Sequence, residues 1–145
     1  MVSKGFSLIE LMVVVAVVGI LVGISIPVYN TFVVKAQVGR AVGELGSYKS
    51  GVEQHSSSPA MLTNAQIGYV VSPLTDGDEQ VQIVTFEADG SGHLQVTMGG
   101  TAHPNVAGTI IRHVRTAEGR WNCVIDISAA TSWRDAYRPN GCTVL

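Results

Sequence analysis

The chain has 145 residues, of which 46% are hydrophobic and 14% are charged, and its formal net charge is −2. That length allows one globular domain once a long apolar segment is set aside. Acidic side chains dominate the middle, where residues 44–103 carry one Lys against seven Asp or Glu, whereas residues 1–43 and 104–145 are each +2. The acidic middle is expected to be a solvated face, and the small C-terminal excess is weak evidence for a nucleic-acid-binding protein.

An apolar segment dominates the N-terminal part of the chain. From Leu11 to Val34 a run of 24 residues carries no charged side chain, and a helix needs about 20 apolar residues to cross a bilayer. One carboxylate, Glu10, stands at the start of this segment. Because an ionisable group near the bilayer centre costs about 2.5–3.5 kcal/mol on insertion scales, Glu10 needs a compensating partner.

A cleaved secretory signal peptide is the obvious alternative for this segment. The apolar run is longer than the roughly 7–15 residues of a signal peptide, and no Ala-x-Ala-like cleavage site follows it. Removal of the whole segment is therefore not expected. Lys4 precedes the segment and favours a cytoplasmic N-terminus, while Lys35 and Arg40 beyond it act against that orientation.

The helical pattern continues past the apolar run. Apolar residues recur at spacings of three and four up to Val52, which predicts one helix from about Phe6 to about His55. Such a helix is roughly 75 Å long at 1.5 Å per residue. A small domain cannot bury that length, so a hydrophobic half (6–34) is expected to protrude and an amphipathic half (35–58) to pack on the domain.

Small residues and one proline interrupt the hydrophobic half. Gly19 and Gly23 have the Gly-x-x-x-Gly spacing that lets helix backbones approach closely, although two glycines also fall at this spacing by chance in apolar segments. Pro27 predicts a kink, or a locally melted stretch between Gly19 and Pro27.

After Pro59 the pattern changes to short strands separated by turn signals, and residues 59–145 are expected to form a globular domain. The expected strands are 81–87, 93–98, 109–116 and 120–127. Four antiparallel strands with one apolar face need a cover, and the outer half of the long helix supplies it. The predicted fold is α+β: a long helical spine packed against a four-stranded antiparallel sheet.

Two cysteines, Cys123 and Cys142, lie near the C-terminus. A membrane-directed start implies export to an oxidising compartment, where the two can form a disulfide that closes a C-terminal loop; a pair of buried free thiols is the alternative. Closing a loop of about 20 residues stabilises a protein by roughly 3 kcal/mol in the chain-entropy model.

No catalytic constellation is visible, so neither an enzyme nor a cofactor is expected. The four His residues have no zinc-ligand spacing with Cys or acidic residues. The run Asp76-Gly77-Asp78-Glu79 lacks the twelve-residue calcium-loop pattern and reads as a solvated acidic loop. No metal site is predicted.

The N-terminal sequence Gly5-Phe6-Ser7-Leu8-Ile9-Glu10-Leu11, followed by Ile26-Pro27, resembles the signature of the type IV pilins of the short-leader class (type IVa), with Ser7 in place of the usual Thr. The motif is highly specific and covers about the first third of the chain. The C-terminal pattern Trp121-x-Cys123 and Pro139-x-x-Cys142 also resembles the disulfide-closed loop of these pilins.

The resemblance implies roles for individual residues. Residues 1–5 are then a leader that a prepilin peptidase cuts between Gly5 and Phe6, with methylation of the new Phe6 amine. Glu10 pairs with the N-terminal amine of a neighbouring subunit. The precursor waits in the inner membrane of a Gram-negative-type bacterium, where assembly machinery adds it to a helical homopolymer, the extracellular pilus (fimbrium).

The function implied is that of a major pilin in a retractable filament for adhesion to host or abiotic surfaces, twitching motility, biofilm formation and DNA uptake. One alternative is a type II secretion pseudopilin, which the Cys123–Cys142 loop argues against, since major pseudopilins commonly lack it. Another is a minor pilin that binds DNA or a receptor. Five C-terminal Arg residues allow DNA binding, but no aromatic-and-basic groove is visible.

Overall fold

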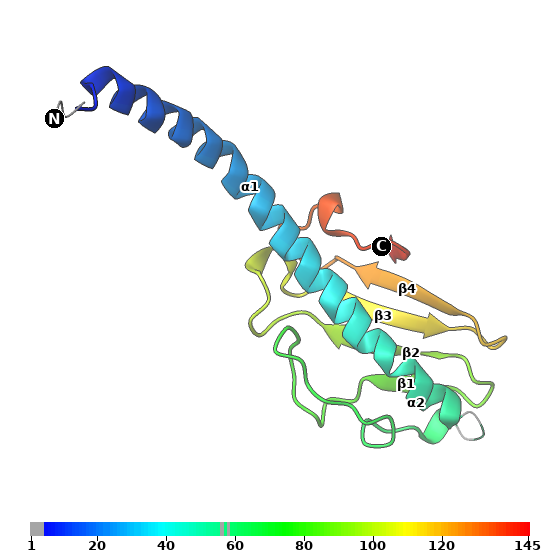
Figure 1. Cartoon of the computed structure of the whole chain (residues 1–145). Coiled ribbons are helices and arrows are strands. Elements are labelled where there is room, and N and C mark those ends of the chain that lie inside the picture. The colour runs from blue at the N-terminus through cyan, green and yellow to red at the C-terminus, as the bar shows by residue number, and fades with distance from the viewer. Residues whose placement is uncertain (1–4, 56, 58) are drawn as a thin grey trace. The chain divides into compact units, whose positions relative to one another are not determined.

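The computed structural model describes residues 5–55, 57 and 59–145. The first four residues of the expected leader, including Lys4, and Ser56 and Ser58 at the expected helix end lie outside the described residues. The chain divides into two compact units, one ending at Val33 and one comprising Val34–Leu145. The first unit is helical in all described residues from Leu8 onward, and the second combines helix and sheet (Figure 1).

Two consecutive helices replace the single predicted helix. The first, α1, comprises Leu8–Ser47, and the second, α2, comprises Lys49–Gln54. Between them the amide of Tyr48 bonds to the carbonyl of Leu45, three residues back, at 3.3 Å, which tightens the helix for one turn. The predicted helical extent is therefore right to within a few residues at each end, apart from this break.

The second unit contains a five-stranded sheet in the order β1-β2-β3-β4-β5. The strands are β1 (Val84–Phe86), β2 (Gly92–Thr97), β3 (Ile110–Arg115), β4 (Trp121–Asp126) and β5 (Cys142–Val144). Strands β1 to β4 pair antiparallel, as predicted, whereas β5 pairs parallel to β4. The predicted α+β fold is confirmed, and the predicted count of four strands is wrong by one.

Strand β5 was missed because a tertiary bond positions it. It has only three residues and follows an irregular stretch, so no alternating pattern in the sequence predicts it. Cys142 is the register partner of Cys123, to which it is joined by a disulfide across a Cα–Cα distance of 4.5 Å. The covalent bond holds this short segment beside β4, where its backbone groups complete the edge of the sheet.

The core of the second unit lies between the helices and one face of the sheet. Its helical side is a stripe at spacings of three and four, formed by Val34, Val38, Ala41 and Leu45 of α1 and Val52 of α2. The sheet side includes Leu94, Val96, Ile111 and Ile125, all buried in the same cluster. Figure 1 shows this part of α1 lying across the strands, as the predicted cover of the sheet should.

A long connection before β1 is held by a buried asparagine. The side chain of Asn64 donates to the carbonyl oxygens of Glu79 and Val81 and accepts from the amide of Ile83. Three directional bonds from one 7%-exposed side chain fix the path of the chain into β1. The described residues of this unit also form three short 3₁₀ helices, Pro59–Met61, Pro104–Val106 and Asp135–Tyr137.

Candidate assembly site at the N-terminus and the disulfide region

The first functional candidate is the start of α1, where Ser7 and Glu10 bond reciprocally. The Glu10 carboxylate oxygen Oε2 accepts from the Ser7 amide at 2.8 Å and from the Ser7 hydroxyl at 2.7 Å. In return, the Glu10 amide bonds to the Ser7 hydroxyl oxygen at 3.3 Å. This is a capping box, which satisfies backbone donors left unpaired at a helix N-terminus.

Sequence reasoning missed this capping role for Glu10. The signal was present as Ser7-x-x-Glu10 immediately before an apolar run, which is the usual pattern of a capping box. Only Oε2 is engaged. Among the described residues, Glu10 Oε1 has no hydrogen-bond partner. The same carboxylate therefore holds its own helix start and keeps one oxygen available to a second donor.

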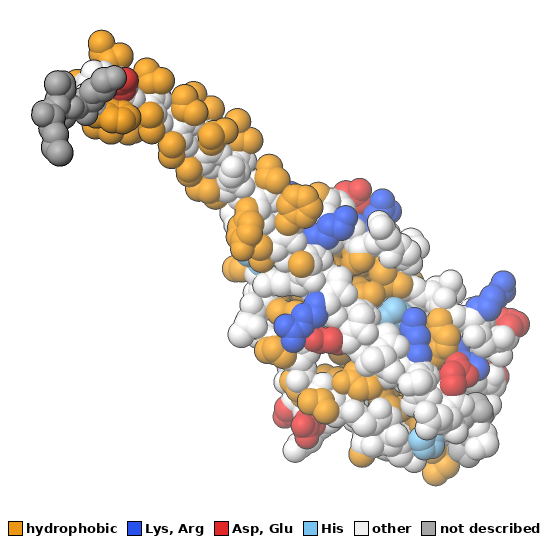
Figure 2. Space-filling model, in the orientation of Figure 1, with side chains coloured by type: hydrophobic (Ala, Val, Ile, Leu, Met, Phe, Trp, Pro, Cys, Tyr) orange, Lys and Arg blue, Asp and Glu red, His pale blue; other side chains and the backbone are white. Residues whose placement is uncertain are grey.

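The apolar part of α1 exposes its side chains on every face. All residues from 5 to 30 are exposed, including Leu8 at 76% and Ile24 at 63%. Figure 2 shows hydrophobic side chains along the whole visible face of this segment. By length and composition, α1 could cross a membrane.

The residues predicted to kink or pack this helix lie within one continuous α-helix. Helix α1 continues through Gly19, Gly23 and Pro27, so the locally melted alternative is not what the structure shows. The Thr31 hydroxyl bonds to the carbonyl of Pro27 at 3.1 Å. A Cβ atom built at either glycine would meet nothing within 4 Å, so both leave open helix surface. Their role in close packing stays a prediction.

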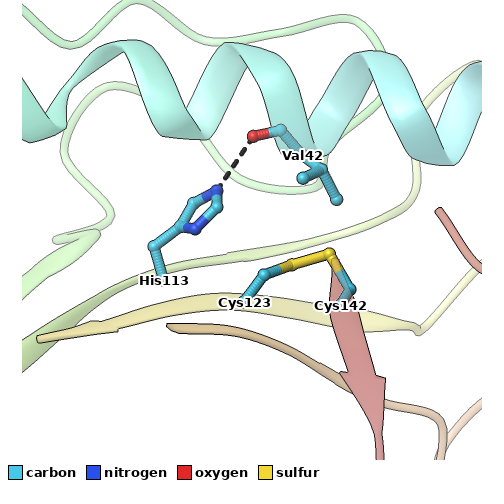
Figure 3. The surroundings of a disulfide bond; sticks show 4 residues. All are labelled: Val42, His113, Cys123 and Cys142. Atoms are coloured by element: carbon cyan, nitrogen blue, oxygen red, sulfur yellow. Dashed lines mark hydrogen bonds between the residues drawn. A yellow bond between two sulfur atoms is a disulfide. The ribbon is translucent and has the colours of Figure 1, made fainter. Parts of the chain in front are cut away.

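The second candidate is the disulfide region at the far end of the chain. Cys123 and Cys142 are bonded, as predicted, and they join β4 to β5 under the helix (Figure 3). His113 is the register partner of Cys123 on β3. Its ring points to α1 and lies 3.0 Å, at Nε2, from the carbonyl oxygen of Val42.

His113 is one of the few polar side chains in the core, with 4% of its surface exposed. Burial lowers its pKa, as does the charge of Lys49, while the bond to the Val42 carbonyl acts in the opposite direction. The neutral tautomer with the proton on Nε2 fits this site, because Nε2 then donates to Val42. His113 thus links the sheet to the helix in its uncharged form.

A polar cluster around Glu53 of α2 was also not predicted. Glu53 accepts from Arg115 at 2.8 Å and from the Trp121 indole nitrogen at 2.8 Å, and Arg115 also donates to the Gly90 carbonyl. Lys49 lies 5.5 Å from the Trp121 ring centroid. These bonds lower the pKa of Glu53, led by the contact with Arg115. The cluster ties α2 to β3 and β4.

Comparison with known proteins identifies the family to which the chain belongs. A family model described as a bacterial filament pilin matches residues 34–143, and a model of the prokaryotic N-terminal methylation motif matches residues 1–26. The chain belongs to the pilin family. This pilin is 37% identical to fimbrial protein Q of Moraxella bovis, with 97% of each chain covered.

Two further relatives extend the comparison. The type IV major alpha-pilin of Moraxella bovis is 33% identical, over 97% of this pilin and 96% of the relative. A fimbrial protein of Pseudomonas aeruginosa is 38% identical, with the same coverage. The predicted membership of the type IV pilins is confirmed. The chain is a structural pilin subunit.

The acidic run of this pilin serves its own fold. Asp76 Oδ1 accepts from the amide of Gly100 at 3.0 Å, and Asp78 Oδ1 accepts from the amides of Gln80 and Val81. Within the described part of the chain, no group of three His, Cys, Asp or Glu side chains could hold a metal ion.

Proposed function

We propose that this pilin is the major subunit of a type IV pilus, made as a precursor with leader 1–5 and held in the inner membrane by residues 6–34. A prepilin peptidase cuts between Gly5 and Phe6, and the Phe6 amine is methylated. The match of residues 1–26 to the N-terminal methylation motif and the name of the Moraxella bovis major pilin support this processing.

The observation that carries the proposal is the exposed apolar helix. Side chains such as Leu8 and Phe32 remain 76% and 67% exposed although each gains about 1.5–3 kcal/mol when fully buried. A helix that is hydrophobic all round requires an apolar environment. Lipid supplies it before assembly and the same segments of other copies supply it afterwards. A head-to-tail contact that does not close then yields an open helical filament.

Glu10 gives this assembly its register. A buried charge without a partner costs several kcal/mol, so the carboxylate must find a cation inside the bundle. The amine of Phe6 of an incoming subunit is the proposed partner, and Glu10 Oε1 is the proposed acceptor, since Oε2 already caps the helix. Gly19 and Gly23 are proposed to let neighbouring helices approach closely. Pro27 is proposed to kink the helix within the filament.

The proposed uses of the filament are retraction-driven twitching, adhesion to host or abiotic surfaces, biofilm formation and DNA uptake. DNA binding by the subunit itself has less support. Of the five C-terminal Arg residues, Arg112 pairs with Asp126, Arg115 with Glu53 and Arg138 with Asp135. Three of the five side chains thus already have carboxylate partners, which weakens the case for a basic surface that binds a phosphate backbone.

The test separates the two functions of Glu10. Glu10→Gln keeps a side chain that a capping box accepts but removes the charge, whereas Glu10→Val removes both. In a pilin-deficient host with an intact assembly system, both variants should be processed and retained in the membrane yet give no filaments. Fibres sheared from the cells are counted by electron microscopy, and the subunit is identified by mass.

The control is Glu118→Gln, because Glu118 is an exposed carboxylate in the turn between β3 and β4. This variant should assemble normally. Abundant filaments from Glu10→Gln but none from Glu10→Val would show that the carboxylate acts through the helix cap and would overturn the pairing role. Filaments in which another protein is the main subunit would overturn the assignment as major pilin.

A further inference from the structure

The turn before β5 contains an asparagine followed directly by a glycine. Asn140 and Gly141 form this turn, both residues are exposed, and Gly141 has φ of +83°. A Cβ atom built on Gly141 would meet nothing within 4 Å. The turn is therefore open on the side where a Gly141 side chain would stand, and both of its residues are accessible to water.

We propose that Asn140 is a site of spontaneous deamidation and isoaspartate formation in this pilin. The backbone nitrogen of Gly141 attacks Cγ of Asn140 and loses its proton, a C–N bond closes a five-membered succinimide, and ammonia leaves with the side-chain nitrogen. Water then opens the ring at either carbonyl and leaves aspartate or isoaspartate. The reaction consumes one water, releases one ammonia and needs no oxidant, reductant or enzyme.

The absence of a side chain on the following residue makes this position distinctive. The chain has five Asn residues, and only Asn140 precedes a Gly. Glycine exposes its backbone nitrogen and adopts the backbone angles that ring closure demands. Within the described residues, neither the Gly141 amide nor the Asn140 side chain makes a hydrogen bond. In that part of the structure no hydrogen bond has to break before these two groups can react.

The other asparagines of the folded domain are restrained. Asn64 is buried with three side-chain hydrogen bonds, and the Asn105 side chain donates to the Tyr137 hydroxyl at 3.0 Å. Asn122 serves as the internal control for Asn140. It is exposed like Asn140, but it lies within β4 and is followed by Cys123. Exposure is thus matched, and backbone conformation and the following residue differ.

The modification would change the loop without releasing it. Residues 128–141 carry Arg134 and Arg138 against Asp135, so one new carboxylate cancels their net charge of +1. Isoaspartate also adds one methylene to the main chain at residue 140, two positions before Cys142. Because the disulfide to Cys123 anchors Cys142, the extra length is absorbed in the loop while β5 keeps its place beside β4.

The experiment follows both asparagines in one sample. Full-length pilin purified in detergent is incubated at mildly alkaline pH in water enriched in ¹⁸O, then reduced, alkylated and digested with trypsin. Cleavage after Arg120 and Arg134, but not before Pro139, yields peptides 121–134 and 135–145, which contain Asn122 and Asn140 as their only Asn residues. Mass spectrometry and labelling by an isoaspartyl methyltransferase report the products.

The expected result is a time-dependent mass shift with ¹⁸O uptake and methyl labelling in peptide 135–145, with peptide 121–134 unchanged. In Asn140→Gln the shift should be lost, because a six-membered ring closes far more slowly. No shift in peptide 135–145, or equal shifts in both peptides, overturns the proposal. The measurement does not depend on filament assembly, so its outcome is independent of the proposed function.

Discussion

Two stretches of helix α1 differ sharply in the burial of their side chains. In residues 8–30 of α1 every side chain is exposed, whereas from Val34 onward the helix buries a stripe in which Val38 is 0% and Leu45 is 2% exposed. Both stretches belong to the continuous helix α1, and both contain several Val and Leu residues. Helical propensity therefore does not distinguish them.

The distribution of polar residues makes the difference. The first stretch has apolar side chains on all faces and a single carboxylate, while the second alternates its buried stripe with Lys35, Gln37, Arg40 and Glu44. A one-sided stripe matches one sheet face of the same chain, and an all-round apolar surface requires lipid or other copies. The comparison teaches that one helix can be stabilised within the subunit at one end and by its surroundings at the other.

The largest expected effect comes from truncating one leucine in each stretch, which tests directly whether the two stretches differ in their contribution to stability. Leu45→Ala should lower the free energy of unfolding of the second unit by about 2–5 kcal/mol, because it opens a cavity in the core. Leu21 is 59% exposed, so Leu21→Ala should change this stability by less than about 0.5 kcal/mol. Urea unfolding of full-length protein in detergent, followed by tryptophan fluorescence, measures both. Equal losses would contradict the division.

The disulfide tests whether the second unit is stable through its core alone. Replacing both cysteines by Ser should cost about 3 kcal/mol, since the bond closes a loop across a sequence separation of 19 residues. Protection of β5 amides from hydrogen exchange should fall before that of β2 and β3, because β5 depends on this bond for its position. A variant whose β5 stays as protected as β3 would show that strand pairing suffices.

The capping box tests the beginning of the first stretch. Ser7→Ala removes the hydroxyl that contacts both the amide and the carboxylate of Glu10, and should cost about 0.5–2 kcal/mol of local helix stability. Hydrogen exchange at Glu10 and Leu11 in detergent micelles is the readout. Ser7→Thr, which keeps the hydroxyl, should behave like the unaltered chain, and similar fraying in both variants would argue against the cap.

The smallest expected effect is a pH dependence from His113. Because burial lowers its folded pKa below the ordinary value of 6.5, both states are uncharged above that pH and the stability is complete. As pH falls below 6.5 the unfolded chain binds the proton first, so the free energy of unfolding decreases until pH passes the folded pKa.

Denaturation midpoints between about pH 5 and 7 should therefore fall with acidification, and His113→Gln should flatten that slope. Lys49 is the charged group that acts on the ring from the helix side, and its own charge is unchanged in this range. A slope that is identical in the variant would assign the acid sensitivity to other groups.

Several features followed from local patterns alone. The alternation within the antiparallel strands and the Gly-containing turns between them predicted β1 to β4 to within a few residues. The two cysteines and the export signal predicted the disulfide. The pattern Ser7-x-x-Glu10 before an apolar run also indicates the capping box from the sequence alone.

Other features had no local signature. Asn64 organises the connection through acceptors 15 and 17 residues away, and His113 bonds to a helix carbonyl 71 residues away. Both are ordinary polar residues in the sequence, and neither residue type nor spacing distinguishes them from surface residues. Their importance arises from burial, which turns an optional hydrogen bond into a required one.

The sequence by itself determined the apolar segment with its lone carboxylate, the amphipathic stripe beyond it, the hairpin strands and the family, because these depend on periodicity and short motifs. Only the tertiary structure decided the fifth strand, its parallel direction and the partners of Asn64, Glu53 and His113. Those depend on which distant backbone and side-chain groups meet when the helix covers the sheet, and desolvation at that contact sets the energy of each.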